Sequence, residues 1–481
     1  MTQKRYEMMV GLEVHVALNS QSKMFCRCSS RFGDPPNTNV CPVCLGLPGG
    51  LPVPNQEAVR LGVRAALALN CEVHRRTRFD RKNYFYPDLT KGYQITQVYE
   101  PLGTNGYIDV GNPPKRIRIK RLHLEEDTGK SLHAGDDITT ASYTLMDFNR
   151  SGVPLVEIVS EPHISTPEEA RQYLEKMQRT LYFAGVSDVK MEEGSMRVDC
   201  NISVRPSGAK TPGARVELKN LSSLRAVTRA LAYEYQRQVA LVDRGEEVPQ
   251  ETRHWDEGKE VTFPLRQKDA TVDYWSFPEP DMAYLELSSE FIQEVRDNMP
   301  ELPSEIVGRY VNQLGLPEYD AEVLTQSPSL VHFFDSCVRL GAQPKTVSNW
   351  VMGDLLGYMK AKGLTHDQIP VSSENLVSMI GLIEKEVISG KIAKDVLIKM
   401  IETGKTPEAI VEEEGLKQVS DEASLLAVVD SVIESNAAAV ADLKAGKDKA
   451  LGFLVGQVMK ATKGKANPAK VNIMLKKKIL S

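Results

Sequence analysis

Alternation of apolar and polar residues marks several segments in about the first 290 residues, and this pattern limits the possible folds more than any other feature. Residues 215–219 form one such segment. In a longer one the apolar side chains share a single face: Met196, Val198, Cys200, Ile202 and Val204. Strands that are apolar on one face only are typical of antiparallel sheets. Because no strand–helix–strand rhythm is visible, we do not expect a doubly wound sheet.

The spacing of apolar residues becomes helical from about residue 290. Residues 303–314 and 348–362 predict helices, and a break at 404–407 precedes another helical segment. Within the β-rich part, Thr166 as a cap and Pro167 in the first turn predict a helix over 166–184. We therefore expect an α+β chain with a β-rich body at 1–292, a helical domain at 293–405 and a basic helical tail at 406–481.

The overall composition excludes several classes of protein. A chain of 481 residues with 41% hydrophobic residues can bury more than one core. No run of about 18 apolar residues occurs, and the N-terminus lacks the pattern of a signal or transit peptide. The cysteines number seven and are partly clustered, which is not typical of a disulfide framework. These features predict a reduced, cytoplasmic protein with no membrane association.

Positive charge is concentrated near the C-terminus. Residues 443–481 carry a net charge of +9, which leaves −14 on the first 442 residues because the whole chain carries −5. A basic tail on an acidic body favours an anionic partner, with RNA the obvious candidate. The alternative is an ordinary solvated, lysine-rich surface.

Four of the cysteines form two close pairs separated by a short segment: Cys26, Cys28, Cys41 and Cys44. Two such pairs can place four thiolates tetrahedrally around Zn²⁺. Four thiolates leave no open coordination position, so we expect a structural zinc site. The alternatives are free cysteines or a site that has lost its metal. The other three cysteines are isolated in sequence, and we expect them to be buried.

Carboxylates on predicted strands form a second candidate site. Glu13 and His15 share one face of an alternating segment, where such a pair can ligate a hard divalent cation or shuttle protons. Glu157 lies within an apolar strand and therefore needs a partner or a metal.

A further strand is predicted over 116–127, and its alternation slips by one position between 119 and 122, as at a β-bulge. It ends in three consecutive acids, Glu125, Glu126 and Asp127. Taken alone, this triplet favours a solvated acidic turn, and a site that uses the three carboxylates is the alternative.

Basic and aromatic residues are interleaved between positions 79 and 94. They could hold phosphates and stack on a base or ribose, or the aromatic residues could fill a small core. Gly129-Lys130-Ser131 resembles the end of a P-loop, but position 124 is Leu where that motif requires Gly. Neither a G-x-S-x-G nor an H-E-x-x-H motif occurs.

Taken together, these motifs closely resemble the GatB family, the B subunits of tRNA-dependent amidotransferases. The resemblance covers the whole chain, because the tail is similar to the family's small helical YqeY-type domain. One departure is that the family usually has Pro-Asp where this chain has Pro162 and His163. The matching segments are GLEVH at 11–15, FDRKNYFYPD at 79–88, LHLEED at 122–127, NRSGVPLVEI at 149–158, KMEEG at 190–194 and RVDCN at 197–201.

This resemblance implies a cradle-like body and a two-step reaction on misacylated tRNA. ATP would phosphorylate the side-chain carboxylate of Glu-tRNA(Gln) or Asp-tRNA(Asn), and ammonia from an amidase partner, the A subunit, would displace the phosphate. A small C subunit would complete a heterotrimer. Phosphoryl transfer between anions requires Mg²⁺ to offset their charge.

The resemblance also implies roles for single residues. Glu157 would lie near the Mg²⁺/ATP site, Lys82 would contact phosphate or gate the ammonia path, and Asp199 would line the same pocket. Arg81 and Tyr84 would bind the cofactor beside Lys82. The Mg²⁺/ATP site itself would consist of four residues: Glu13, His15, Glu125 and Glu126.

Two other classes of protein stay open from the residues alone. The first is a non-catalytic module that presents tRNA to another enzyme. It would fit the basic tail, but the strand with Glu13 and His15 and the acid Glu157 within an apolar strand argue against it. The second class is a free-standing ATP-dependent ligase, but neither a nucleotide-binding loop nor a glutaminase triad is visible in the sequence.

Overall fold

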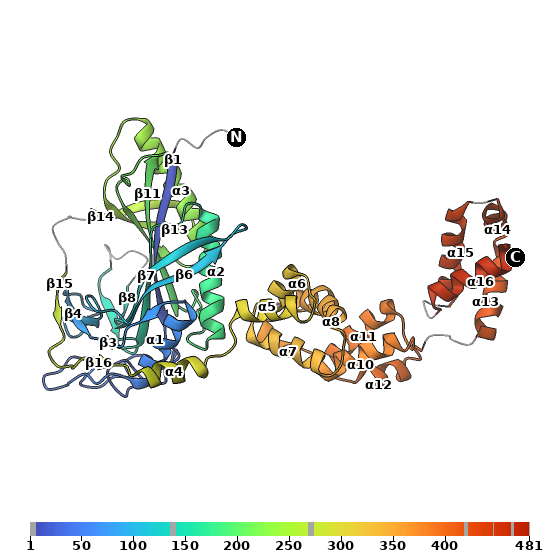
Figure 1. The fold of residues 1–481 in the computed structure, drawn as a ribbon, viewed down its shortest axis with the longest axis horizontal. Coiled ribbons are helices and arrows are strands. Elements are labelled where there is room, and N and C mark those ends of the chain that lie inside the picture. The colour runs from blue at the N-terminus through green and yellow to red at the C-terminus, as the bar shows by residue number, and fades with distance from the viewer. Residues whose placement is uncertain are drawn as a thin grey trace. The chain divides into compact units, whose positions relative to one another are not determined.

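The structure is a computed structural model that describes residues 6–134, 141–267, 274–417, 422–445, 447–462 and 466–480 (Figure 1). The chain divides into two compact units, Met1–Pro303 and Ser304–Ser481. The first is a mixed α/β unit and the second is helical. Among the described residues, no helix combines the length and the apolar character needed to cross a bilayer.

A nine-stranded sheet forms the centre of the first unit, with the order β14-β13-β12-β11-β1-β10-β7-β6-β2. Its neighbouring strands run antiparallel, except for the parallel pair β12 and β13. The expected antiparallel-rich sheet is confirmed. The strands are β1 Tyr6–Ala17, β2 Glu72–Val73, β6 Gly103–Val110, β7 Lys115–Glu126, β10 Pro154–Ser160, β11 Met196–Pro206, β12 Val216–Leu221, β13 Glu251–Asp256 and β14 Val261–Gln267.

The apolar face of this sheet is covered by helices α1 (Gln56–Ala68), α2 (Pro167–Phe183) and α3 (Leu224–Asp243), which share one core with it. The Thr166 side chain caps α2 as predicted, by accepting a hydrogen bond from the Glu169 N–H. Helix α1 packs so closely that a Cβ at Gly62 would lie 2.7 Å from a methyl group of Leu124. A fourth helix, α4, spans Ser289–Asp297.

The alternation along β1 directs Leu12, Val14 and Val16 into the core, each at most 1% exposed. Glu13 and His15 consequently lie on the opposite, polar face. Strand β11 alternates in the same way. The sequence pattern therefore determines which face of the sheet carries the polar side chains.

Three smaller sheets complete the strands of the first unit. The sheet β15-β4-β5 contacts the end of β7 through β5. These strands are β4 Asp80–Asn83, β5 Tyr93–Thr96 and β15 Trp275–Pro278, and the two remaining antiparallel pairs are β3 Arg76–Thr77 with β16 Leu285–Glu286 and β8 Lys130–His133 with β9 Thr144–Asp147.

The second unit consists of helices, and the predicted break at 404–407 is present because α11 ends at Thr403 and α12 begins at Pro407. The predicted helix over 348–362 contains a π-helical turn, η1, at Val351–Leu355. The helices are α5 Pro303–Asn312, α6 Glu318–Leu324, α7 Pro328–Arg339, α8 Pro344–Trp350, α9 Leu356–Lys362, η2 His366–Gln368, α10 Ser373–Glu384, α11 Gly390–Thr403, α12 Pro407–Glu413, α13 Glu422–Ser435, α14 Ala437–Lys444, α15 Asp448–Ala461 and α16 Pro468–Leu480. The last four share a core of their own.

Candidate functional site

Charged side chains form a row across four neighbouring strands on the polar face of the central sheet. His15 on β1 lies opposite Arg197 on β11 and Glu157 on β10, and Glu157 in turn lies opposite His123 on β7. Directly opposed residues in antiparallel strands place their side chains on the same face and in contact range. The register therefore brings together residues that lie far apart in the sequence.

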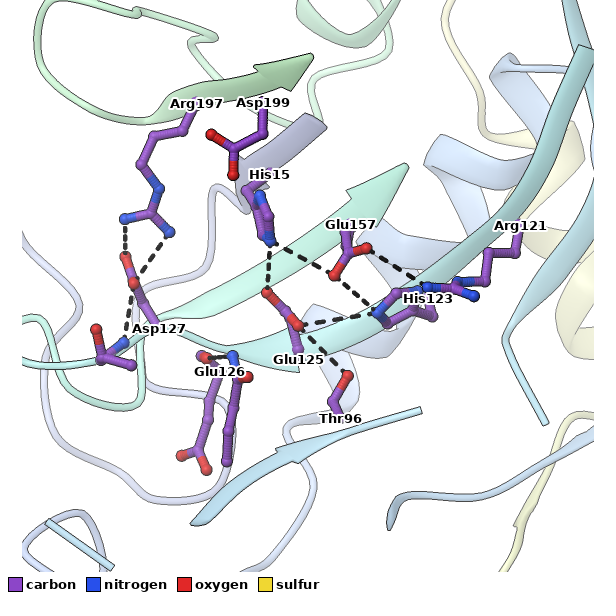
Figure 2. A network of polar contacts seen from close by, with 12 residues as sticks. His15, Thr96, Arg121, His123, Glu125, Glu126, Asp127, Glu157, Arg197 and Asp199 are labelled. Atoms are coloured by element: carbon purple, nitrogen blue, oxygen red, sulfur yellow. Dashed lines mark hydrogen bonds and ion pairs between the residues drawn. The ribbon is translucent and has the colours of Figure 1, made fainter. Parts of the chain in front are cut away.

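Short contacts join this row to a further carboxylate, as Figure 2 shows. The Nε2 atom of His15 lies 3.3 Å from a Glu125 oxygen and 3.4 Å from a Glu157 oxygen. The Nε2 atom of His123 lies 3.2 Å from the same Glu157 oxygen. With Glu13, whose carboxylate lies next to His15 and Glu157, these residues form the group that we call the carboxylate–histidine cluster.

The predicted bulge explains why His123 and Glu125 face this cluster. The pairing of β10 with β7 shifts between Val159 and Ser160, where Lys120 on β7 is left without an opposing residue. Beyond the bulge, alternation places His123 and Glu125 on the face of Glu157 and directs Leu124 into the core. The predicted slip in alternation is confirmed.

Burial and mutual charge perturb the titration of the cluster. Burial alone would lower the pKa of His15, but its hydrogen bond to Glu157 and the carboxylates around it raise that pKa to about 9. The pKa of His123 also rises to about 9, because Glu157 and Glu125 outweigh the effect of burial. Burial and the charge of Glu157 raise the pKa of Glu13. Without a cation, both imidazoles therefore carry the positive charge that balances the carboxylates.

The donor atoms of the cluster fit a hard divalent cation. Glu13, His15 and Glu157 each offer an atom within 4.8 Å of the others, and His123, Glu125 and Glu157 form a second such set. Carboxylate oxygens are the ligands that Mg²⁺ prefers in proteins. Glu125, Glu157 and His123 are buried, and Glu13 and His15 are half-buried. A cation among them could replace the protons that the imidazoles hold.

The prediction of a solvated acidic turn at the end of β7 is wrong. Glu125, Glu126 and Asp127 are 2%, 3% and 6% exposed. Glu125 and Glu126 have partners from another segment: the Thr96 hydroxyl donates to Glu125 at 3.3 Å, and the Ile95 N–H donates to Glu126 at 3.0 Å. These partners lie about 30 residues away in the sequence, so the triplet alone does not reveal them.

Glu126 and Asp127 lie outside the carboxylate–histidine cluster. Glu126 points away from His15 in Figure 2 and pairs with Lys91. Asp127 receives two hydrogen bonds of 3.0 Å from the guanidinium of Arg197. Of the four residues predicted at a Mg²⁺/ATP site, the structure thus brings together Glu13, His15 and Glu125, but not Glu126.

Asp199 lies on the polar face of β11, opposite Glu13. It pairs with Lys219 on β12, whose ammonium group also lies 3.2 Å from Glu217. Asp199 therefore borders the cluster, and Lys219 neutralises part of the negative charge at this edge.

The basic and aromatic segment divides between two environments. Arg81 forms ion pairs of 2.7 Å with Glu279 and 2.9 Å with Asp281. Lys82 lies opposite Gln94 on β5, which donates to the backbone oxygen of Glu126, so Lys82 shares the face that meets the end of β7.

Aromatic rings of this segment lie both in the core and in solvent. Phe79 is 2% exposed and Phe85 is 89% exposed, so a small aromatic core explains the first residue but not the second. The Tyr84 ring lies 5.3 Å from that of Tyr274, and the ammonium group of Lys82 lies 4.9 Å from the Tyr274 ring. Burial and the charge of Glu125 raise the pKa of Tyr84.

The four clustered cysteines also converge. The Sγ atoms of Cys26, Cys28, Cys41 and Cys44 all lie within 4.8 Å of one another, so this group could hold a metal such as zinc. The isolated Cys71, Cys200 and Cys337 are buried, as predicted.

Several residues of the site were not predicted. His123 could have been found, because it lies two positions before Glu125 on one strand and must share its face. Lys91, Arg197 and Lys219 meet their acids only through tertiary contacts, and no local pattern marks them.

The fold and the cluster define a protein whose β-rich unit carries a candidate cation site on the polar face of a mixed sheet. Residues 8–293 match the model of the GatB/GatE catalytic domain, and residues 332–479 match the GatB domain model. The chain belongs to the GatB family.

Similar proteins cover nearly the whole chain, and three of them carry the name of the B subunit of aspartyl/glutamyl-tRNA(Asn/Gln) amidotransferase. The protein from Caldanaerobacter subterraneus is 51% identical over 477 residues, 99% of each chain. That from Brevibacillus brevis is 52% identical over 473 residues, 98% of each chain. That from Thermotoga maritima is 48% identical over 476 residues, 98% of this chain and 99% of the relative.

Proposed function

We propose that this chain is the subunit of a tRNA-dependent amidotransferase that activates the side-chain carboxylate of Glu-tRNA(Gln), Asp-tRNA(Asn) or both for amidation. The names of its full-length relatives support this function. The structural observation that carries it is the convergence of Glu13, His15, Glu125 and Glu157 on one patch of the polar face of the sheet.

The chemistry requires activation because a free carboxylate is a poor acyl donor. The γ-phosphoryl group of ATP moves to a carboxylate oxygen, and ADP leaves. The nitrogen of ammonia then attacks the carbonyl carbon, phosphate leaves with its bonding electrons, and a proton is lost to give the amide. When bound, Mg²⁺ offsets the charge of the phosphates during the first step.

The cluster has the residues for this task. The oxygens of Glu13, Glu125 and Glu157 and the Nε2 atom of His15 would hold the cation. His123 would orient Glu157, because its Nε2 atom lies 3.2 Å from that carboxylate. Without a cation, the protons on the two imidazoles balance the charge of the carboxylates.

Residues around the cluster would bind and orient the reacting groups. Lys82 would contact phosphate or the ammonia path, with Tyr84 beside it near Glu125. Asp199 would line the same region through its place opposite Glu13. Because Arg81 is already paired with Glu279, we assign it to positioning β4 rather than to direct contact with the cofactor.

Glu126 would support the cluster from the other face of β7. Its backbone oxygen accepts from Gln94 at 2.7 Å and its side chain binds the Ile95 N–H, so it fastens β5 to the end of β7. This places Thr96 within reach of Glu125.

The four cysteines would hold a structural zinc, since four thiolates leave no position for substrate.

The basic tail would bind the tRNA body. An amidase A subunit would supply ammonia and a small C subunit would complete a cytoplasmic heterotrimer. We expect the three-part division at 1–292, 293–405 and 406–481 to separate the chemistry from tRNA binding.

A non-catalytic subunit that only presents tRNA is not favoured, because such a role gives no reason to gather three carboxylates, two of them buried, in one place. The test is ATP hydrolysis by the purified protein, with and without its partner subunits and acylated tRNA. We expect hydrolysis that depends on Glu-tRNA(Gln) or Asp-tRNA(Asn). ATP hydrolysis that does not depend on acylated tRNA would indicate a different ligase. If the complete complex binds tRNA but does not hydrolyse ATP, the chain is the non-catalytic module that presents tRNA.

A further inference from the structure

Lys23 is a lysine with 0% exposure, which is unusual for a residue that normally keeps its ammonium group in water. Among the described residues its ammonium group has two polar contacts. It lies 3.6 Å from the Sγ atom of Cys44 and donates to the backbone oxygen of Phe148 at 3.1 Å. The carbonyl is neutral, so the Cys44 sulfur, which becomes a thiolate when it ligates a metal, is the one of these two contacts that can balance the charge of this buried ammonium group.

The charges of the cysteine cluster explain why a cation belongs at this place. Four thiolates exceed the charge of a divalent cation, so the loaded centre is negative overall. Buried charges persist only when they are paired. We propose that Lys23 is the charge partner of the four-cysteine metal centre, where it stabilises the Cys44 thiolate and thereby slows the loss of zinc.

Backbone contacts hold the Lys23 side chain in this position. The Lys23 N–H donates to the Cys28 oxygen at 3.0 Å, and the next N–H donates to the Gly152 oxygen at 2.7 Å. Gly152 has a φ of +87°, and a Cβ there would lie 3.3 Å from the Lys23 stem. The stem is therefore clamped between the cysteine segment and the turn at 148–152.

The same turn connects the metal centre to the acids at the end of β7. Arg150 on this turn lies 3.6 Å from Asp127, and the Ser151 hydroxyl lies 3.5 Å from the Cys44 oxygen. Through Phe148, Lys23 thus attaches the cysteine segment to the turn that leads into β10.

Lys91 provides a matched control. It lines the same cavity of about 110 Å³ as Lys23 and Cys44, but its ammonium group pairs with Glu126 and not with a cysteine. Removing its charge alters another lysine of the same cavity and leaves the contact between Lys23 and Cys44 in place.

The experiment compares the wild-type full chain with Lys23→Met, Lys23→Arg and Lys91→Met. Zinc content is measured by elemental analysis, and the rate of zinc transfer to a chromogenic chelator by absorbance. We expect Lys23→Met to lose zinc about 10- to 100-fold faster than the wild type, the range typical for partners of metal ligands. Lys23→Arg should retain most of the protection, and Lys91→Met should match the wild type.

Equal zinc release by Lys23→Met and the wild type would overturn the proposal. So would equally fast release by Lys91→Met, which would indicate general loosening of the cavity. If Lys23→Met fails to fold, the alternative measurement is the rate of chemical acetylation of Lys23 in the wild-type protein, determined by mass spectrometry. Zinc should slow that reaction, and equal rates with and without zinc would refute the pairing.

This inference rests on the zinc assignment and not on the amidation chemistry. If the wild-type protein contained no zinc, both the zinc assignment and the proposed role of Lys23 would be wrong. The test of the proposed function, tRNA-dependent ATP hydrolysis, would be unaffected, so failure of this inference and failure of the proposed function are distinguishable.

Discussion

The side chain of His15 lies between two carboxylates, because oxygens of Glu125 and Glu157 lie within 3.4 Å of its Nε2 atom. Its raised pKa of about 9 means that it is protonated at neutral pH when no cation is bound. Cation binding at His15 must therefore displace the proton on Nε2, and the charge of the cation would then keep Glu125 and Glu157 from repelling each other.

We predict that His15→Ala abolishes tRNA-dependent ATP cleavage and spares tRNA binding, because only the proposed cation site is damaged. The loss of turnover should exceed about 100-fold, because removing even a partner of a metal ligand costs about 10- to 100-fold. The measurement is ATP turnover at saturating Mg²⁺ together with tRNA affinity. His332→Ala, an exposed histidine on α7, is the control. Near-normal turnover of the His15 variant would mean that the ligands are wrongly assigned.

Asp127 gives a prediction about pH. Burial tends to raise the pKa of Asp127, but Arg197 and Arg150 outweigh it and hold that pKa below its usual range. A pKa lower in the folded than in the unfolded chain adds stability above the unfolded value of about 3.9, and this contribution is lost as pH falls through the folded value. Asp127→Asn should cost roughly 2 kcal/mol at pH 7 and should flatten the acid dependence.

Calorimetric unfolding between pH 7 and pH 3 measures this effect. Glu168→Gln is the matched control, because Glu168 also has a lowered pKa, of about 2 through its hydrogen bond to Arg171, but its side chain is 54% exposed. An exposed pair contributes less than about 1 kcal/mol. Indistinguishable acid profiles for the Asp127 and Glu168 variants would contradict the assignment.

Among secondary-structure elements, the strands were the most predictable. Alternation alone placed Glu13 and His15 on the polar face of β1 and Asp199 on that of β11. The slip in alternation located the bulge in β7. These predictions succeeded because the side-chain period of a strand is a local property that burial on one face makes visible.

The acidic triplet was wrongly predicted because its burial depends on β5 and β11, which approach it only in the folded chain. No pattern within residues 125–127 shows that Ile95, Thr96 and Arg197 supply the partners. The convergence of Glu157 with His15 likewise depends on strand order, which alternation does not specify.

The cysteine segment between β1 and α1 gives a prediction about an element. Cys41→Ser should abolish zinc retention and lower the unfolding temperature of the first unit, because the segment has little regular structure to hold it. The second unit should unfold unchanged, and the protein that stays folded should keep its chemistry. Calorimetry and elemental analysis test this. Freshly purified, chelator-free wild-type protein without zinc would refute the zinc assignment itself.

For the chain as a whole, we propose that the first unit activates the carboxylate and that the basic tail binds the tRNA body. Residues 443–481 form the dense basic region, with a net charge of +9. They follow the break before Pro407, which begins α12. Phosphate contacts weaken with salt in proportion to the number of phosphates neutralised.

Deleting the chain from Lys405 onward should raise the apparent KM for tRNA and flatten its salt dependence. The maximal rate should fall much less than kcat/KM, because binding rather than a transition-state contact is lost. Glutaminase activity of the partner subunit should survive. Steady-state kinetics at several salt concentrations measure both effects. An unchanged affinity and salt slope would show that the lysines are ordinary solvated surface.

Activation of a carboxylate by phosphorylation can be detected by following one oxygen atom from the substrate to the phosphate. Glutamyl- or aspartyl-tRNA labelled with ¹⁸O in the side-chain carboxylate is amidated by the complete complex, and the released phosphate is analysed by mass spectrometry. If an acyl phosphate forms, each turnover transfers one carboxylate oxygen to phosphate, so labelled phosphate and amide appear in equal amounts. Amide formed alongside unlabelled phosphate would show that this chain does not activate the carboxylate by phosphorylation.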